Sequence, residues 1–96
     1  MSYRKGRRFE YRVRDLFRRR GWIVIRAAAS KPVDLVCLKK GVAILVECKN
    51  RKHVSRGEVA PLIELADKSM SRPVIALNNK GKILLTDLKS YKPFKP

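Results

Sequence analysis

Two short apolar runs on either side of a glycine turn constrain this chain most. Residues 33–38 and 42–48 are rich in Val, Ile and Leu, and a Lys-Lys-Gly segment at 39–41 separates them. Apolar, β-branched runs of this length around a glycine turn are typical of a β-hairpin. Each run also carries one acid, Asp34 and Glu47. A carboxylate in such a run is costly to bury unless it is paired or binds a metal.

The length of the turn sets which residues of the hairpin face each other. A two-residue turn at Lys40-Gly41 places Asp34 directly opposite Glu47, and directly opposed residues share one face. Lys49 follows Glu47 by two positions and therefore lies on the same face. A three-residue turn would shift the pairing by one and separate these side chains. The two-residue register thus predicts two carboxylates and one ammonium group in one patch.

The remaining pattern predicts two helices and three further strands. The expected elements are a helix over 4–20, a strand over 22–27, the hairpin, a helix over about 55–70, and strands over 73–77 and 82–86. Pro61 either kinks the second helix or begins its regular part. The order predicts an α/β fold in which helices flank a mixed five-stranded sheet, as a single domain over residues 1–96.

The first helix adds a third acid. Its apolar face contains Phe9, Val13, Leu16 and Phe17. At about 100° per residue, Glu10 falls beside Phe17 on the edge of this face. Glu10 is therefore expected to point toward the margin of the core.

The charge of the chain indicates a polyanionic partner. Twenty-four Lys and Arg residues stand against eight acids, for a net charge of +16. This balance is typical of nucleic-acid binding, with an anionic membrane surface as the weaker alternative. The expected phosphate contacts, whose alternative is a generic solvated surface, are Arg4, Lys5, Arg7, Arg8, Lys31, Arg51, Lys52 and Arg56. Without a transmembrane run or the apolar stretch of a signal peptide, the protein is expected to be intracellular.

Carboxylates in a basic chain suggest metal-dependent phosphodiester cleavage. Asp34 and Glu47 can share one Mg²⁺, with Mn²⁺ as a substitute, and the backbone carbonyl of Cys48 can be a further ligand. Lys49 can orient the attacking water or stabilise the charge on phosphorus. Glu10 can hold a metal-bound water or a second ion. The alternative is a structural ion pair between Asp34 and Lys49.

Several segments together resemble the archaeal-type Holliday junction resolvases of the PD-(D/E)xK nuclease superfamily. The similar segments are residues 5–10, 26–30, 33–36 and 45–52. The resemblance implies a restriction-endonuclease-like fold and a Mg²⁺-dependent homodimer that nicks four-way DNA junctions in recombination and repair. It also implies metal ligation by Asp34 and Glu47, catalytic support from Lys49, and essential roles for Glu10 and Ser30.

The sequence leaves other functions open. A 96-residue core is small, which independently favours a homodimer. Another nuclease of the same superfamily, acting on flaps or single strands, fits the same acids. A non-catalytic basic nucleic-acid-binding module fits the charge, but acids on a phosphate-facing patch would repel its ligand.

Overall fold

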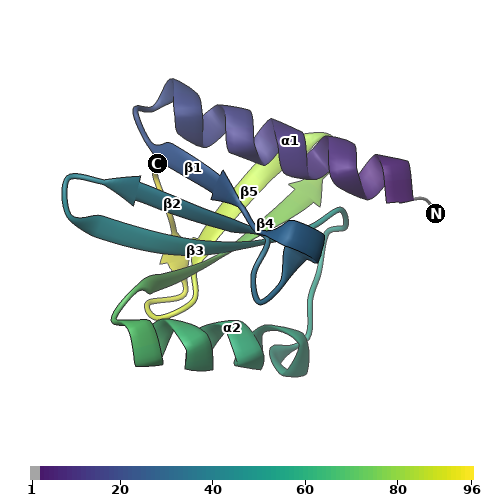
Figure 1. Cartoon of the computed structure of the whole chain (residues 1–96). Helices are drawn as coiled ribbons and strands as arrows, with labels where there is room; N and C mark the ends of the chain where they lie inside the picture. The colour runs from purple at the N-terminus through teal and green to yellow at the C-terminus, as the bar shows by residue number, and fades with distance from the viewer. Residues whose placement is uncertain (1–2) are drawn as a thin grey trace.

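The structure, a computed structural model, describes residues 3–96, with side chains from Lys5 onward. Its elements are α1 (Tyr3–Arg19), β1 (Ile23–Arg26), a 3₁₀ turn η1 (Ala28–Ser30), β2 (Leu35–Lys39), β3 (Val42–Lys49), α2 (Arg56–Ser69), β4 (Arg72–Asn79), β5 (Lys82–Asp87) and β6 (Lys92–Pro93). The strands form one sheet in the order β1-β2-β3-β4-β5-β6, with α1 and α2 on opposite faces (Figure 1).

The sheet confirms the expected mixed α/β architecture and differs in one detail. The strands β3 and β4 are parallel, and all other neighbours are antiparallel. The prediction of five strands is wrong by one, because the chain after β5, where no strand was expected, contributes the two-residue strand β6. Phe94 follows β6 and packs on Phe17 and Trp22, with its ring centroid 6.1 Å and 6.3 Å away, respectively. This aromatic contact holds the end of the chain against the core.

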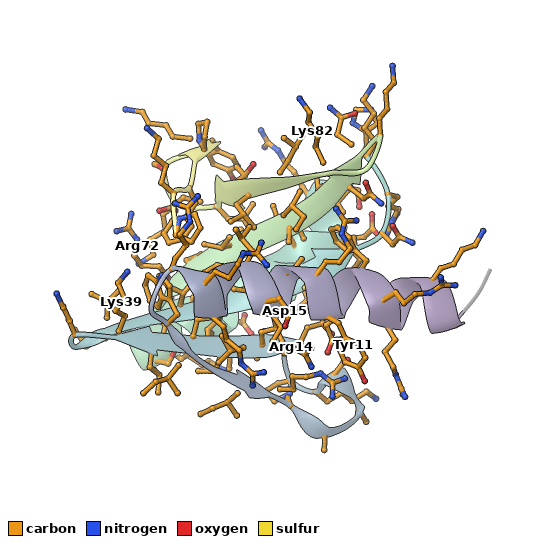
Figure 2. All side chains as sticks on the ribbon, turned by 90° about the horizontal axis from the view of Figure 1, so that it is seen from above. Tyr11, Arg14, Asp15, Lys39, Arg72 and Lys82 are labelled. Atoms are coloured by element: carbon orange, nitrogen blue, oxygen red, sulfur yellow. The ribbon has the colours of Figure 1, made fainter. Side chains whose placement is uncertain are left out.

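The helix α1 covers one face of the sheet with its apolar side, as its pattern predicts. Phe9, Val13 and Phe17 are buried there with Val24 and Ile44 of the sheet. On the exposed side of α1, Asp15 forms an ion pair with Arg14 at 2.9 Å. Figure 2 shows both residues on the same side of the helix as Tyr11. None of the helices of the described chain is long and apolar enough to cross a membrane.

The helix α2 covers the other face and is continuous through Pro61. Ser55 caps its N-terminus, and the Glu58 side chain returns a hydrogen bond to the Ser55 backbone, which completes a capping box. The regular helix therefore begins at Arg56, and the alternative start at Pro61 is wrong. Because Pro61 has no N–H, the carbonyl of Gly57 lacks its helical hydrogen bond. Gly57 is exposed in the first turn of α2, where water can solvate this carbonyl.

The β2–β3 hairpin has the predicted two-residue turn. Lys40 and Gly41 have φ angles of 48° and 81°, the left-handed pair required by the tightest hairpin turn. Leu35 pairs with Val46 and Cys37 with Ile44, which confirms the predicted register. The crossover through α2 then sets β4 parallel to β3, with Lys49 beside Leu77. This arrangement places the charged end of β3 between β2 and β4.

Candidate active site

Asp34 lies at the end of the hairpin, immediately before β2. The ladder ends at the pair Leu35 and Val46, so one more step of the same register sets Asp34 opposite Glu47. Asp34 is only 6% exposed, and its Oδ2 accepts a hydrogen bond of 2.7 Å from the backbone N–H of Cys48. The bond ties Asp34 to β3 and leaves its second carboxylate oxygen for another partner.

The negative charge of Glu47 is only partly compensated by its surroundings in the protein. Burial, as the largest cause, and the neighbouring charge of Asp34 together raise the pKa of Glu47 to about 7. The Nζ of Lys49 lies 3.8 Å from Glu47 Oε2 and opposes this shift without cancelling it. A bound cation would remove the repulsion between the two carboxylates, so this pair favours a cation.

Glu10 reaches the same neighbourhood from α1. It is 8% exposed, and its Oε2 accepts a 2.7 Å hydrogen bond from Nε of Arg26. Its charge also contributes to the raised pKa of Glu47. Arg26 was missed as a site residue by the sequence reasoning. The available signal is its position two residues after buried Val24, on the face of β1 toward α1.

Ser30, unlike the buried Asp34 and Glu10, lies in an exposed turn. Ser30 is exposed in η1, where it and Ala29 both have φ angles of 54°. Its backbone N–H donates to the carbonyl of Ala27 at 3.1 Å. The fold therefore brings Asp34, Glu47 and Lys49 together and leaves Ser30 on the approach to β2.

The oxygen atoms of this site suit a hard divalent cation. No group of three or more His, Cys, Asp and Glu side chains in the described chain can hold a metal. Mg²⁺ does not require one, because it commonly binds one or two carboxylates and keeps several waters. Asp34 and Glu47 could supply two such carboxylates, and the Cys48 carbonyl is the adjacent backbone oxygen. The carboxylate of Glu10 forms an ion pair with Arg26, so it is not counted among the carboxylates that could bind the cation directly.

Comparison with known proteins decides the family. Residues 1–95 match the family described as archaeal Holliday junction resolvase (Hjc). The chain belongs to this family.

Individual resolvases support the assignment. The chain is 33% identical over 87 residues to the crossover junction endodeoxyribonuclease Hjc of Methanocaldococcus jannaschii, covering 86% of this chain and 65% of that protein. It thus spans somewhat less than two thirds of that relative. The fold resembles Hjc from the archaeal hyperthermophile Archaeoglobus fulgidus, a Holliday junction resolvase, with a TM-score of 0.74 and 24% identity, over 88% of this chain and 74% of the other.

The basic residues expected to contact phosphate fall into groups with different surroundings. Arg51 forms an ion pair with Glu58 at the start of α2, so part of its charge is used within the fold. The side chains of Lys5, Arg7, Arg8, Lys31, Lys52 and Arg56 are exposed. Arg4 lies outside the residues whose side chains are described. The exposed group remains the expected surface for phosphate.

Replacing Glu47 with Gln is expected to stabilise the metal-free protein at pH 8. The raised pKa means that folding is penalised once Glu47 ionises. The penalty is absent below its ordinary pKa of 4.5, grows as the pH rises toward about 7, and stays constant above it. Glu47→Gln should therefore gain about 1–3 kcal/mol in urea unfolding with EDTA at pH 8 and almost nothing at pH 4.

A matched control for this measurement is Glu64→Gln. Glu64 is exposed on α2 and pairs with Lys68 at 3.9 Å, so the change removes the same charge from a solvated position. Its effect should stay within about 0.5 kcal/mol. A Glu47→Gln protein that is less stable than the parent at pH 8 would show that the folded state satisfies the Glu47 carboxylate without metal.

Proposed function

We propose that this chain is a single-domain, Mg²⁺-dependent endonuclease that nicks four-way DNA junctions. The observation that supports it best is the hairpin register that opposes Asp34 and Glu47, with Lys49 on the same face. Family membership supports the substrate class, and the net charge of +16 supports a polyanionic ligand. Mn²⁺ is expected to replace Mg²⁺, because both accept carboxylate oxygens.

Each proposed site residue has a defined task in the hydrolysis. Asp34 and Glu47 would hold the cation, which supplies an activated water and neutralises charge on the phosphate. Lys49, beside Glu47, provides a fixed positive charge where negative charge develops on the phosphate oxygens. Arg26 orients Glu10 at the margin of the site, and Glu10 can accept a hydrogen bond from a water there. Ser30 is proposed to contact DNA from the exposed turn before β2.

The function is tested with a labelled four-way junction, a flap, a duplex and a single strand of the same sequences. Cleavage of the junction with Mg²⁺, its loss with EDTA, and slower cleavage of the other DNAs are expected. Faster cutting of the flap or the single strand would assign another nuclease activity to the same acids. Tight junction binding with no cleavage in Mg²⁺ or Mn²⁺ would support a non-catalytic module.

We also propose that the working nuclease is a homodimer, because a symmetric junction presents two equivalent strands. The apolar side chains of Ile23, Ile25 and Leu38 are exposed on the adjacent strands β1 and β2, where Ile23 pairs with Leu38, and they offer contact area for a second copy. Light scattering should give twice the 11.1 kDa mass at the concentrations used for cleavage. A monomeric mass under conditions of full junction cleavage would contradict the dimer.

A further inference from the structure

A basic hollow, separate from the candidate active site, lies on the α1 face of the sheet beside the ends of β3 and β4. It is a hollow of about 270 Å³ lined by Lys5, Arg8, Phe9, Arg12, Asn50 and Asn78. No acid is among these residues, whereas the neighbouring candidate active site is built on carboxylates. Buried Phe9 lies among the basic side chains, and the three cations follow one side of α1 at turn spacing.

The two asparagines have their amide orientation determined by the backbone. The N–H of Gly81 donates to Asn78 Oδ1 at 2.8 Å, so Nδ2 of Asn78 is the donor that meets Asn50 Oδ1 at 2.7 Å. The Asn50 oxygen is thereby used as an acceptor. Its Nδ2 group keeps two N–H donors that have no acceptor among the described residues. The pair therefore presents donors to the hollow.

Arg12 is tied to the same glycine. Its Nη2 donates to the carbonyl of Gly81, and its guanidinium lies 5.8 Å from the centroid of the Phe9 ring. A guanidinium has five N–H donors, so most remain available after the single bond to Gly81. Figure 2 shows Lys82, the residue after Gly81, on the opposite side of α1 from Tyr11 and Arg14. Gly81 thus holds both Arg12 and the asparagine pair in place on that side.

We infer that this hollow binds one phosphate group of the DNA backbone, close to the phosphate that is cleaved. The inference rests on the proposed nuclease function for its substrate and on the hollow for its chemistry. Positioned guanidinium and amide donors without a competing acid match a tetrahedral anion, and Arg12 and Arg8 can supply charge-assisted hydrogen bonds. Because Asn50 directly follows Lys49, a phosphate held here would anchor DNA on the α1 side while Asp34 and Glu47 face the reacting phosphate.

Inorganic phosphate tests the hollow without any cleavage. Titrated into ¹⁵N-labelled protein, it should give saturable shifts of the side-chain amides of Asn50 and Asn78 and of the Gly81 backbone amide. Arg12→Gln should abolish the saturation. Arg8→Gln should weaken it, and it removes no hydrogen bond of the described fold. Lys40→Gln, the same charge change at the far turn of the β2–β3 hairpin, should behave as the parent. Equal, non-saturating shifts in all four proteins would overturn the site.

Junction binding in EDTA then distinguishes a DNA phosphate from a free anion. Arg12→Gln should weaken junction affinity about tenfold and reduce the slope of log K against log salt by about one. Lys40→Gln should change the slope much less. Unchanged binding by Arg12→Gln, together with saturable inorganic phosphate, would overturn the DNA assignment. Failure of the parent to cut junctions would refute the proposed nuclease, yet these binding measurements would still test the hollow.

Discussion

Junction cleavage by an Asp34→Asn protein is expected to be abolished while junction binding is retained. The asparagine Oδ1 can still accept the hydrogen bond from the Cys48 N–H that Asp34 accepts at 2.7 Å, so the end of the hairpin should remain closed. What the change removes is the negative charge with which Asp34 is proposed to hold a cation beside Glu47. Affinity for the junction should stay equal or rise, because a charge that repels phosphate is lost. Cleavage and gel-shift assays on one preparation measure both quantities.

Two further variants separate the chemical role of Asp34 from its structural one. Asp34→Ala removes both the charge and the acceptor for Cys48, so it should lose cleavage and also some stability. Asp15→Asn removes one charge from the exposed side of α1, where Asp15 pairs with Arg14, and should cut junctions at the parental rate. If Asp34→Asn loses binding to the same extent as cleavage, Asp34 supports the fold and is not a metal ligand.

Lys49→Ala is expected to bind junctions almost normally and to cut them roughly 10²–10³-fold more slowly. The Lys49 ammonium lies 3.8 Å from Glu47 Oε2, beside the pair of opposed carboxylates. A positive charge in this place is expected to stabilise the transition state more than the bound substrate. Its loss should therefore lower the rate at which bound DNA is cleaved. Single-turnover cleavage with saturating protein measures this rate apart from affinity.

Lys52→Ala is the matched variant for Lys49→Ala. Lys52 is exposed in the segment between β3 and α2, beyond the end of the strand. Its removal should weaken binding and reduce the salt dependence, with little change in the single-turnover rate. A Lys49→Ala protein that cuts bound DNA at the parental rate and differs only in affinity would make Lys49 a phosphate anchor. The ion-pair interpretation of the carboxylate patch would then gain support.

The hairpin could be predicted from sequence because its information is local. The two apolar runs and the Lys40-Gly41 turn determine the register, and that register places Asp34 opposite Glu47 and Lys49 on the same face. The sequence likewise placed the start of α2 near residue 55, where Ser55 and Glu58 form the capping box, but it left a start at Pro61 open. Such patterns arise from the period of the backbone and from hydrogen bonds over a few residues, so they need no knowledge of the rest of the chain.

Contacts between distant segments were decided only by the tertiary structure. The sequence placed Glu10 at the margin of the core, but its bond to Arg26 depends on how α1 packs over β1. The bond from Arg12 to Gly81 joins residues 69 positions apart and exists because the α2 crossover sets β4 beside β3. No periodic pattern encodes such pairs, because they follow from the packing of whole elements. The sequence by itself therefore determined the carboxylate patch, while the fold decided what surrounds it.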